Sequence, residues 1–307
     1  MRALATGVAA GAMTAFWGAS ALAEDLVGQP TPRAIDMQPG VTALRRDAIF
    51  FHNAILLPII TAIVLLVLGL LVWCVLRYNR KANPTPAKWS HNTVIEVIWT
   101  LAPVLILVFI SIFSFKLLFA YHDMPKPDLT IKATGYQWYW GFEYPDQKIP
   151  EYVANILPED QAKAKGVPYK LASTGPIVVP VNKTVRVLVT GADVIHAFAV
   201  PSFGVLMDAI PGRVNETWFK VDRIGTYYGQ CRELCGVDHA FMPIEVHVVS
   251  QADFDAWVAS KHGTTAAATP TTVAAAATAP SNPAAPAPQG APAAATATPA
   301  PAAPAAH

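Results

Sequence analysis

Long uncharged stretches dominate the first half of the chain and predict membrane-spanning helices. Residues 49–76 contain no Asp, Glu, Lys or Arg and are mostly aliphatic. A second uncharged run covers residues 97–115, and apolar residues continue to Tyr121. A helix rises about 1.5 Å per residue, so each run can cross a hydrocarbon layer about 30 Å thick. Since the two runs follow each other closely, we predict a two-helix transmembrane hairpin over residues 49–121 rather than buried helices of a soluble core.

The segment between the two runs predicts the orientation of the hairpin. Residues 77–95 carry no carboxylate, and short loops rich in positive charge stay in the cytoplasm. The basic residues of this segment are Arg77, Arg80, Lys81 and Lys88. The tip of the hairpin is therefore expected inside the cell. Both termini and the rest of the chain are expected on the periplasmic side of a cell inner membrane.

The N-terminus has the features of a cleaved export signal, residues 1–23. Arg2 precedes an apolar stretch of small residues, and the stretch ends in Ala21-Leu22-Ala23. A small-x-small ending of this kind is typical of signal-peptide cleavage sites. An uncleaved first membrane helix is the alternative. Cleavage would leave residues 24–48 as an exported N-terminal segment, which agrees with the orientation of the hairpin.

After the hairpin, the period of the pattern changes to two. Apolar and polar positions alternate over residues 129–134, 185–190 and 244–249, with many β-branched side chains. Alternation of this kind predicts half-buried strands, and frequent proline and glycine residues separate them. Several short strands within about 120 residues are typical of a β-sandwich or barrel. We expect this domain to span residues 122–262.

Three segments depart from the strand pattern. Residues 158–170 are polar and are compatible with a loop or a short helix. Residues 251–261 place Phe254 and Trp257 on one face of a short helix that is expected to close the domain. Residues 263–307 are almost entirely Ala, Pro and Thr, so we expect a disordered tail without chemistry.

Composition narrows the class of protein. The chain has 307 residues, a net charge of +1 and only 14% charged residues. A balanced charge without a long basic run argues against general nucleic-acid binding. The low charged fraction fits a membrane protein.

Soft metal-binding side chains cluster near the end of the β-rich region. Cys231, Cys235, His239 and Met242 lie close together in sequence. Sulfur and imidazole ligands select copper or zinc, and a thioether favours copper over zinc. A second imidazole is expected from His196, which we place at the end of the strand around residues 185–189. The alternative is a disulfide between the two cysteines, because disulfides persist outside the cytoplasm.

The spacing Cys-x-Glu-x-Cys-x-x-x-His-x-x-Met over residues 231–242, with His196 upstream, resembles the binuclear copper motif of cytochrome c oxidase subunit II. The resemblance covers roughly residues 40–260. It implies a two-helix transmembrane hairpin followed by an all-β, cupredoxin-like Greek-key sandwich. It also implies that Cys231 and Cys235 bridge two copper ions through their thiolates.

The same resemblance implies the remaining ligands. His196 and His239 would each bind one copper ion. Met242 would complete one copper ion, and the backbone carbonyl of Glu233 would complete the other. The Glu233 side chain would face a magnesium ion shared with the catalytic subunit.

A second part of the resemblance lies in residues 135–144, which are rich in aromatic side chains. Clustered aromatic residues are most often part of a core or an interface. In the family, the tryptophan at Trp138 is the point where electrons from cytochrome c enter. The family often has histidine where this chain has Tyr136. Glu143 and Asp193 match acidic positions that receive the lysine-rich face of cytochrome c; otherwise they are ordinary solvated charges.

Two further stretches resemble the family. Glu96 in residues 96–100 matches a glutamate at the entrance of a proton path, although a carboxylate at a helix N-terminus is also favourable by itself. Residues 206–213 match a stretch that faces the catalytic subunit, so Asp208 and Arg213 are expected at that interface.

These observations together imply an electron-transfer subunit of the respiratory chain. The chain would accept electrons from cytochrome c and pass them to haem in subunit I, where reduction of oxygen to water is coupled to proton translocation. Subunits I and III would be its partners in the membrane. No Cys-x-x-Cys-His motif occurs, so no haem is expected in this chain. The alternatives are a copper-free scaffold subunit of a quinol oxidase and an independent membrane-anchored copper carrier or single-copper protein.

Overall fold

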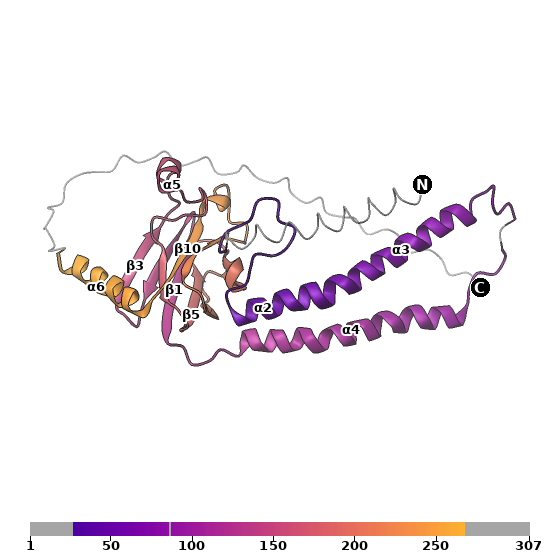
Figure 1. Cartoon of the computed structure of the whole chain (residues 1–307), viewed down its shortest axis with the longest axis horizontal. Coiled ribbons are helices and arrows are strands. Elements are labelled where there is room, and N and C mark those ends of the chain that lie inside the picture. The colour runs from indigo at the N-terminus through magenta and orange to yellow at the C-terminus, as the bar shows by residue number, and fades with distance from the viewer. Residues whose placement is uncertain (1–26, 86, 268–307) are drawn as a thin grey trace, which may run out of the picture. The chain divides into compact units, whose positions relative to one another are not determined.

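A computed structural model describes residues 27–85 and 87–267 of the chain (Figure 1). The expected export signal lies outside the described residues. The expected tail also lies outside them, apart from its first few positions.

Two long helices form the predicted hairpin. The first consists of α2 (Ala43–Phe50), the π-helical segment η3 (Phe51–Leu56) and α3 (Leu57–Arg77), which follow one another without a break. The second is α4 (Thr93–His122). The first helix begins ahead of the uncharged run because Thr42 caps it, with the hydroxyl oxygen accepting a hydrogen bond from Arg45 N at 3.1 Å.

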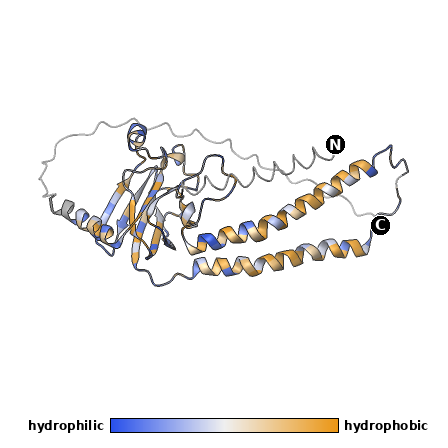
Figure 2. Cartoon of the chain, in the orientation of Figure 1, coloured by the Kyte–Doolittle hydropathy of each residue, from blue (hydrophilic) through white to orange (hydrophobic). Residues whose placement is uncertain are grey.

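The helices present apolar side chains to their surroundings along almost their whole length (Figure 2). Leu65 is 60% exposed and Leu107 is 65% exposed. Water would make such exposure costly, whereas lipid makes it favourable. The helices of 35 and 30 residues are long and apolar enough to cross a membrane.

The rest of the described chain is a β-sandwich. Its strands are β1 (Leu129–Tyr136), β2 (Tyr139–Tyr144), β3 (Ile149–Ala154), β4 (Ile177–Pro180), β5 (Thr184–Gly191), β6 (His196–Val200), β7 (Val205–Ala209), β8 (Asn215–Lys220), β9 (Gly225–Gln230) and β10 (Pro243–Val249). They form a five-stranded sheet in the order β3-β2-β1-β5-β8, a three-stranded sheet in the order β4-β10-β9, and the pair β6-β7.

The alternating pattern places one face of each strand in a shared core. Ile131 on β1, Val187 on β5 and Val246 on β10 are each 0% exposed. β1 and β5 run parallel, which requires the chain to cross over between them, while β9 and β10 form an antiparallel pair. The prediction of a β-sandwich after the hairpin is therefore confirmed.

Two short helices complete the domain. The polar segment that the sequence left open contains α5 (Glu159–Lys165). The closing helix α6 (Gln251–Ala267) starts where predicted but continues past residue 261. The first residues of the predicted tail, 263–267, therefore belong to this helix, although glycine and threonine among them are weak helix formers.

Candidate metal centre

The fold brings His196 to one end of the sandwich. The sequence predicted His196 at the end of the strand around residues 185–189. The structure differs, because β5 ends at Gly191 and His196 is the first residue of the separate strand β6. Its side chain is 0% exposed. The ring packs on Gly135 at the end of β1, where an added Cβ would lie 2.8 Å from His196 Cδ2. Only glycine allows the imidazole to sit this close to the strand.

The loop of residues 231–242 connects β9 to β10 at the same end. The last residue of β9, Gln230, pairs with the first residue of β10, Pro243. Cys231 N donates a hydrogen bond to the Met242 carbonyl at 3.3 Å, which extends this pairing by one step. The strand pairing thereby fixes the two ends of the loop next to each other.

The sulfur and nitrogen donors converge within this loop and on His196. The donor atoms of His196, Cys231 and Cys235 all lie within 4.8 Å of one another. Cys231 Sγ lies 3.9 Å from His196 Nδ1.

The remaining donors gather around the two thiols. Cys235 Sγ lies 3.5 Å from His239 Nδ1 and 3.5 Å from Met242 Sδ. The Glu233 carbonyl oxygen lies 3.3 Å from Cys231 Sγ. Each side chain or carbonyl expected as a copper ligand is therefore within reach of the cluster, whereas the Glu233 side chain is exposed.

The two cysteines are free thiols with their sulfur atoms 3.9 Å apart. A disulfide would bring the sulfur atoms to about 2.05 Å. The arrangement thus differs from the disulfide that was the alternative, and both thiols remain available as ligands.

The pKa values of the two thiols shift in opposite directions. Burial by itself raises the pKa of Cys231, but hydrogen bonds with His196 and the backbone of Ala197 outweigh burial and lower it. Burial, together with the negative charge on Cys231, raises the pKa of Cys235 to about 12. Burial lowers the pKa of His196, but its contacts with Cys231 and Asp193 raise it overall. Metal binding must therefore displace a proton from Cys235, since a metal ligand is a thiolate.

The chemistry of the donor set fits copper. Two thiols and a thioether are soft donors, two imidazoles also suit copper, and the thioether disfavours zinc. Cys231 and Cys235 are each 4% exposed and Met242 is 0% exposed, so bulk water is excluded from the sulfur atoms.

Asp193 fixes the orientation of His196. Its Oδ1 lies 2.8 Å from His196 Nε2, and its Oδ2 accepts a hydrogen bond from Gln137 N at 2.7 Å. Burial raises the pKa of Asp193, but these hydrogen bonds and one from Val194 N lower it overall. A carboxylate on the far nitrogen of a ligand histidine holds the ring so that the other nitrogen, here Nδ1, faces the metal.

Trp138 lies directly against the loop. Its Nε1 donates a hydrogen bond to the Cys235 carbonyl at 3.3 Å. Gln137 Nε2 donates to the same carbonyl at 2.8 Å. The peptide bond between these two residues is cis. Sequence reasoning did not identify Gln137, because only the folded chain brings its side chain to the loop.

The other predicted residues lie away from the cluster. Glu143 on β2 forms an ion pair with Lys132 at 3.2 Å. Asp208 on β7 and Arg213 in the following turn are exposed. Glu96 lies in the first turn of α4.

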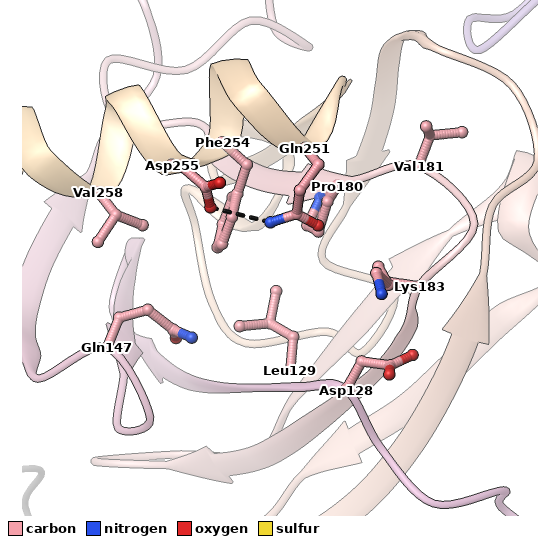
Figure 3. Close-up of a pocket in the computed structure, with 10 residues that line it drawn as sticks. All are labelled: Asp128, Leu129, Gln147, Pro180, Val181, Lys183, Gln251, Phe254, Asp255 and Val258. Atoms are coloured by element: carbon pink, nitrogen blue, oxygen red, sulfur yellow. Dashed lines mark hydrogen bonds between the residues drawn. The ribbon is translucent and has the colours of Figure 1, made fainter.

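A groove in the described chain lies apart from the metal residues (Figure 3). It encloses about 720 Å³ between α6 and the start of β1, with Phe254 and Leu129 on its walls. Gln251 and Asp255 form a 2.9 Å hydrogen bond at its rim. His196 and the metal loop do not line it.

Comparison with known proteins agrees with this geometry. Residues 129–249 match the family described as "Cytochrome C oxidase subunit II, periplasmic domain", and residues 30–117 match "Cytochrome C oxidase subunit II, transmembrane domain". The chain is 50% identical over 236 residues to "Probable cytochrome c oxidase subunit 2" of Rickettsia conorii, covering 77% of this chain and 74% of the relative.

Two further similarities extend the comparison. The chain is 40% identical over 283 residues to "Cytochrome c oxidase subunit 2" of Cereibacter sphaeroides, covering 85% of this chain and 92% of the relative. A crystal structure of the periplasmic domain of cytochrome oxidase subunit II of Bradyrhizobium japonicum is 55% identical, covers 46% of this chain and 99% of its own, and superimposes with a TM-score of 0.43.

Replacing the carboxylate that orients His196 should weaken metal binding. We predict that Asp193→Asn lowers the copper affinity of the detergent-solubilised chain about 10- to 100-fold, as is typical when a partner of a ligand histidine is changed. Titration against a competing chelator measures the affinity. Asp255→Asn on α6 is the matched control and should leave it unchanged. Equal affinities for both variants would contradict the role of Asp193.

Proposed function

This chain belongs to the cytochrome c oxidase subunit II family, and from that membership we propose that it takes electrons from cytochrome c and delivers them toward haem in subunit I. As a member of this family, it is part of an oxidase complex in a membrane. Reduction of oxygen to water and proton translocation would take place in the partner subunit.

The convergence of the donors is the observation that carries the proposal. Cys231 and Cys235 would bridge two copper ions, and His196 and His239 would bind one ion each. With the bridging thiolates, such a pair would supply a redox centre that shares one electron between two metals.

Two more donors would complete the pair. Met242 would bind one ion, and the Glu233 carbonyl would bind the other. The Glu233 side chain, which is exposed, is free to meet a magnesium ion held together with subunit I.

Packing and hydrogen bonds hold the metal-binding side chains in place. His196 is packed against Gly135 and held by Asp193, while Met242 is fully buried. Ligands that are locked by packing and hydrogen bonds keep their positions when the charge at the centre changes. Small movements mean a low reorganisation energy, which favours rapid electron transfer in both directions.

Trp138 would be the point where electrons enter. Its indole is only partly buried and donates a hydrogen bond to the backbone of the ligand Cys235. This contact offers a short connection from the surface to the sulfur cluster. Glu143 on the neighbouring strand and Asp193 add negative charge for a basic cytochrome, although both already have partners in the chain.

Apolar side chains around the loop support contact with partner proteins. Leu234 is 78% exposed and Val237 is 86% exposed on the metal loop itself. Leu206 and Val214, which flank Asp208 and Arg213, are 61% and 60% exposed. Exposed apolar residues mark interaction surfaces, so these two groups of residues would meet partner subunits, subunit I among them. Subunit III would complete the complex.

The membrane part supports the orientation and a second role. The basic loop at the tip of the hairpin supports a cytoplasmic location for that tip, so the copper domain and both termini would lie on the periplasmic side of the inner membrane. Glu96, in the first turn of α4, would then lie at the cytoplasmic end, where it would receive protons for the catalytic subunit.

The copper-free scaffold of a quinol oxidase is less favoured. Such a subunit has no need for the thiols, imidazoles and thioether that converge here. The curated relatives compared above are named as cytochrome c oxidase subunits.

Metal analysis tests the proposal directly. We predict two copper ions per full-length chain and a purple mixed-valence absorption spectrum. Cys235→Ala should abolish the spectrum, because one bridging thiolate is lost. Cys74→Ala removes a cysteine from membrane helix α3 and should preserve both the copper content and the spectrum. A single copper ion, or none, in the wild-type chain would reject the paired centre.

The route through Trp138 has its own test. In the assembled oxidase, Trp138→Ala should slow oxidation of cytochrome c at least tenfold while copper content stays at the wild-type level. The exposed Trp89 in the hairpin loop is the control, and Trp89→Ala should change neither. Loss of copper in Trp138→Ala would show that the indole is needed to build the centre and not to conduct electrons.

The proton role of Glu96 is tested by Glu96→Gln in the assembled oxidase. The amide keeps the size of the side chain but cannot ionise, so we expect turnover to fall several-fold while reduction of the copper centre by cytochrome c keeps its rate. Glu159→Gln, an exposed change on α5, is the control. Unchanged turnover in Glu96→Gln would contradict a role of Glu96 in proton uptake.

A further inference from the structure

Residues 156–173, here called the flap, contact the two ends of the metal loop through Lys170. The flap contains α5 and the turns that follow it. Its two ends are joined by a bridge between Ile156 and Ser173 and by a 2.9 Å hydrogen bond from Leu157 N to the Ala172 carbonyl.

A small separate core anchors the flap to the strands that carry the loop. Leu157, Ala162 and Ala172 are buried against Tyr228 on β9. Ser173 N donates a hydrogen bond of 2.6 Å to Glu245 Oε2 on β10. The flap is therefore fixed to both β9 and β10, the strands that lead into and out of the metal loop.

Lys170 connects the flap to both ends of the loop. Its carbonyl accepts a hydrogen bond from Gln230 Nε2 at 3.3 Å, and its ammonium lies 4.5 Å from the centre of the Phe241 ring. Gln230 directly precedes Cys231, and Phe241 directly precedes Met242. One residue thus contacts the neighbours of the first and the last predicted ligand of the loop.

The backbone of Lys170 is held in an unfavourable conformation for this contact. Its φ is +69°, in the left-handed region that residues other than glycine rarely adopt. Surrounding structure has to maintain such a conformation. The anchored flap supplies that support.

We propose that Lys170 is a positioning residue that latches the metal loop closed, so that it limits how fast the loop opens to release or receive metal. The cation on the ring of Phe241 holds the turn that carries His239, and the carbonyl holds the start of the loop at Gln230. Opening the loop requires both contacts to break, together with the pairing of Cys231 and Met242. This inference rests on the copper centre proposed above.

Copper release from the full-length chain in detergent tests the latch. The chain is loaded with copper, and release is followed by absorbance after addition of an excess of a Cu(I)-specific chelator under reducing conditions. Lys170→Met keeps the length of the side chain but removes the cation, so release should become about two- to fivefold faster, the range expected for loss of an exposed cation–π contact. Lys170→Arg keeps the cation and should release copper at the wild-type rate.

Lys165→Met is the matched control, because it removes the same charge from the exposed surface of the same flap. It should leave the release rate unchanged. A wild-type rate for Lys170→Met, or equal acceleration by Lys165→Met, would overturn the latch. The thermal unfolding temperatures of these variants should agree, since both lysines are exposed.

Amide hydrogen exchange in the metal-free chain gives a reading that does not depend on copper. Residues 231–242 should exchange faster in Lys170→Met than in the wild type or Lys165→Met, because the loop opens more often. Equal exchange in all three would overturn the proposal. If the wild-type chain bound no copper, the proposed function would fail, and this exchange measurement would still decide whether the latch exists.

Discussion

The pairing of β9 with β10 is the constraint on which the metal centre depends. It brings Cys231 and Met242 side by side at the ends of one loop, and the hydrogen bond from Cys231 N to the Met242 carbonyl closes that loop. A second strand pair, β6-β7, then brings His196 to the loop that carries the two cysteines. The side chains of Cys231, Cys235 and Met242 are buried at this point.

The sequence predicted those features that repeat along the chain. Uncharged runs indicated the hairpin, and alternating residues such as Ile131, Val187 and Val246 indicated strands whose inward faces are buried. The spacing of the thiols, imidazole and thioether indicated the chemistry of the loop before any geometry was known. Regular patterns are predictable because each position experiences the same local rule.

Features that depend on contacts between distant residues were missed. His196 opens its own strand because β6 pairs with β7, and the pattern around residues 185–189 contains no sign of that break. Both carboxylate oxygens of Asp193 are used within the site, one by His196 and the other by Gln137 N, which a charge pattern cannot reveal. The contact of Lys170 with both ends of the loop also exists only after the flap has folded onto Tyr228. No local pattern in a single sequence indicates such tertiary contacts.

The exposed leucine and valine on the metal loop have a consequence for biogenesis. Leu234 and Val237 are left in water as long as the chain has no partner against its loop. A newly made copy would carry this exposed apolar patch, and two such copies would tend to associate through it. Chains made in excess of their partner subunits would therefore aggregate through this surface. Matched synthesis of the subunits avoids this aggregation.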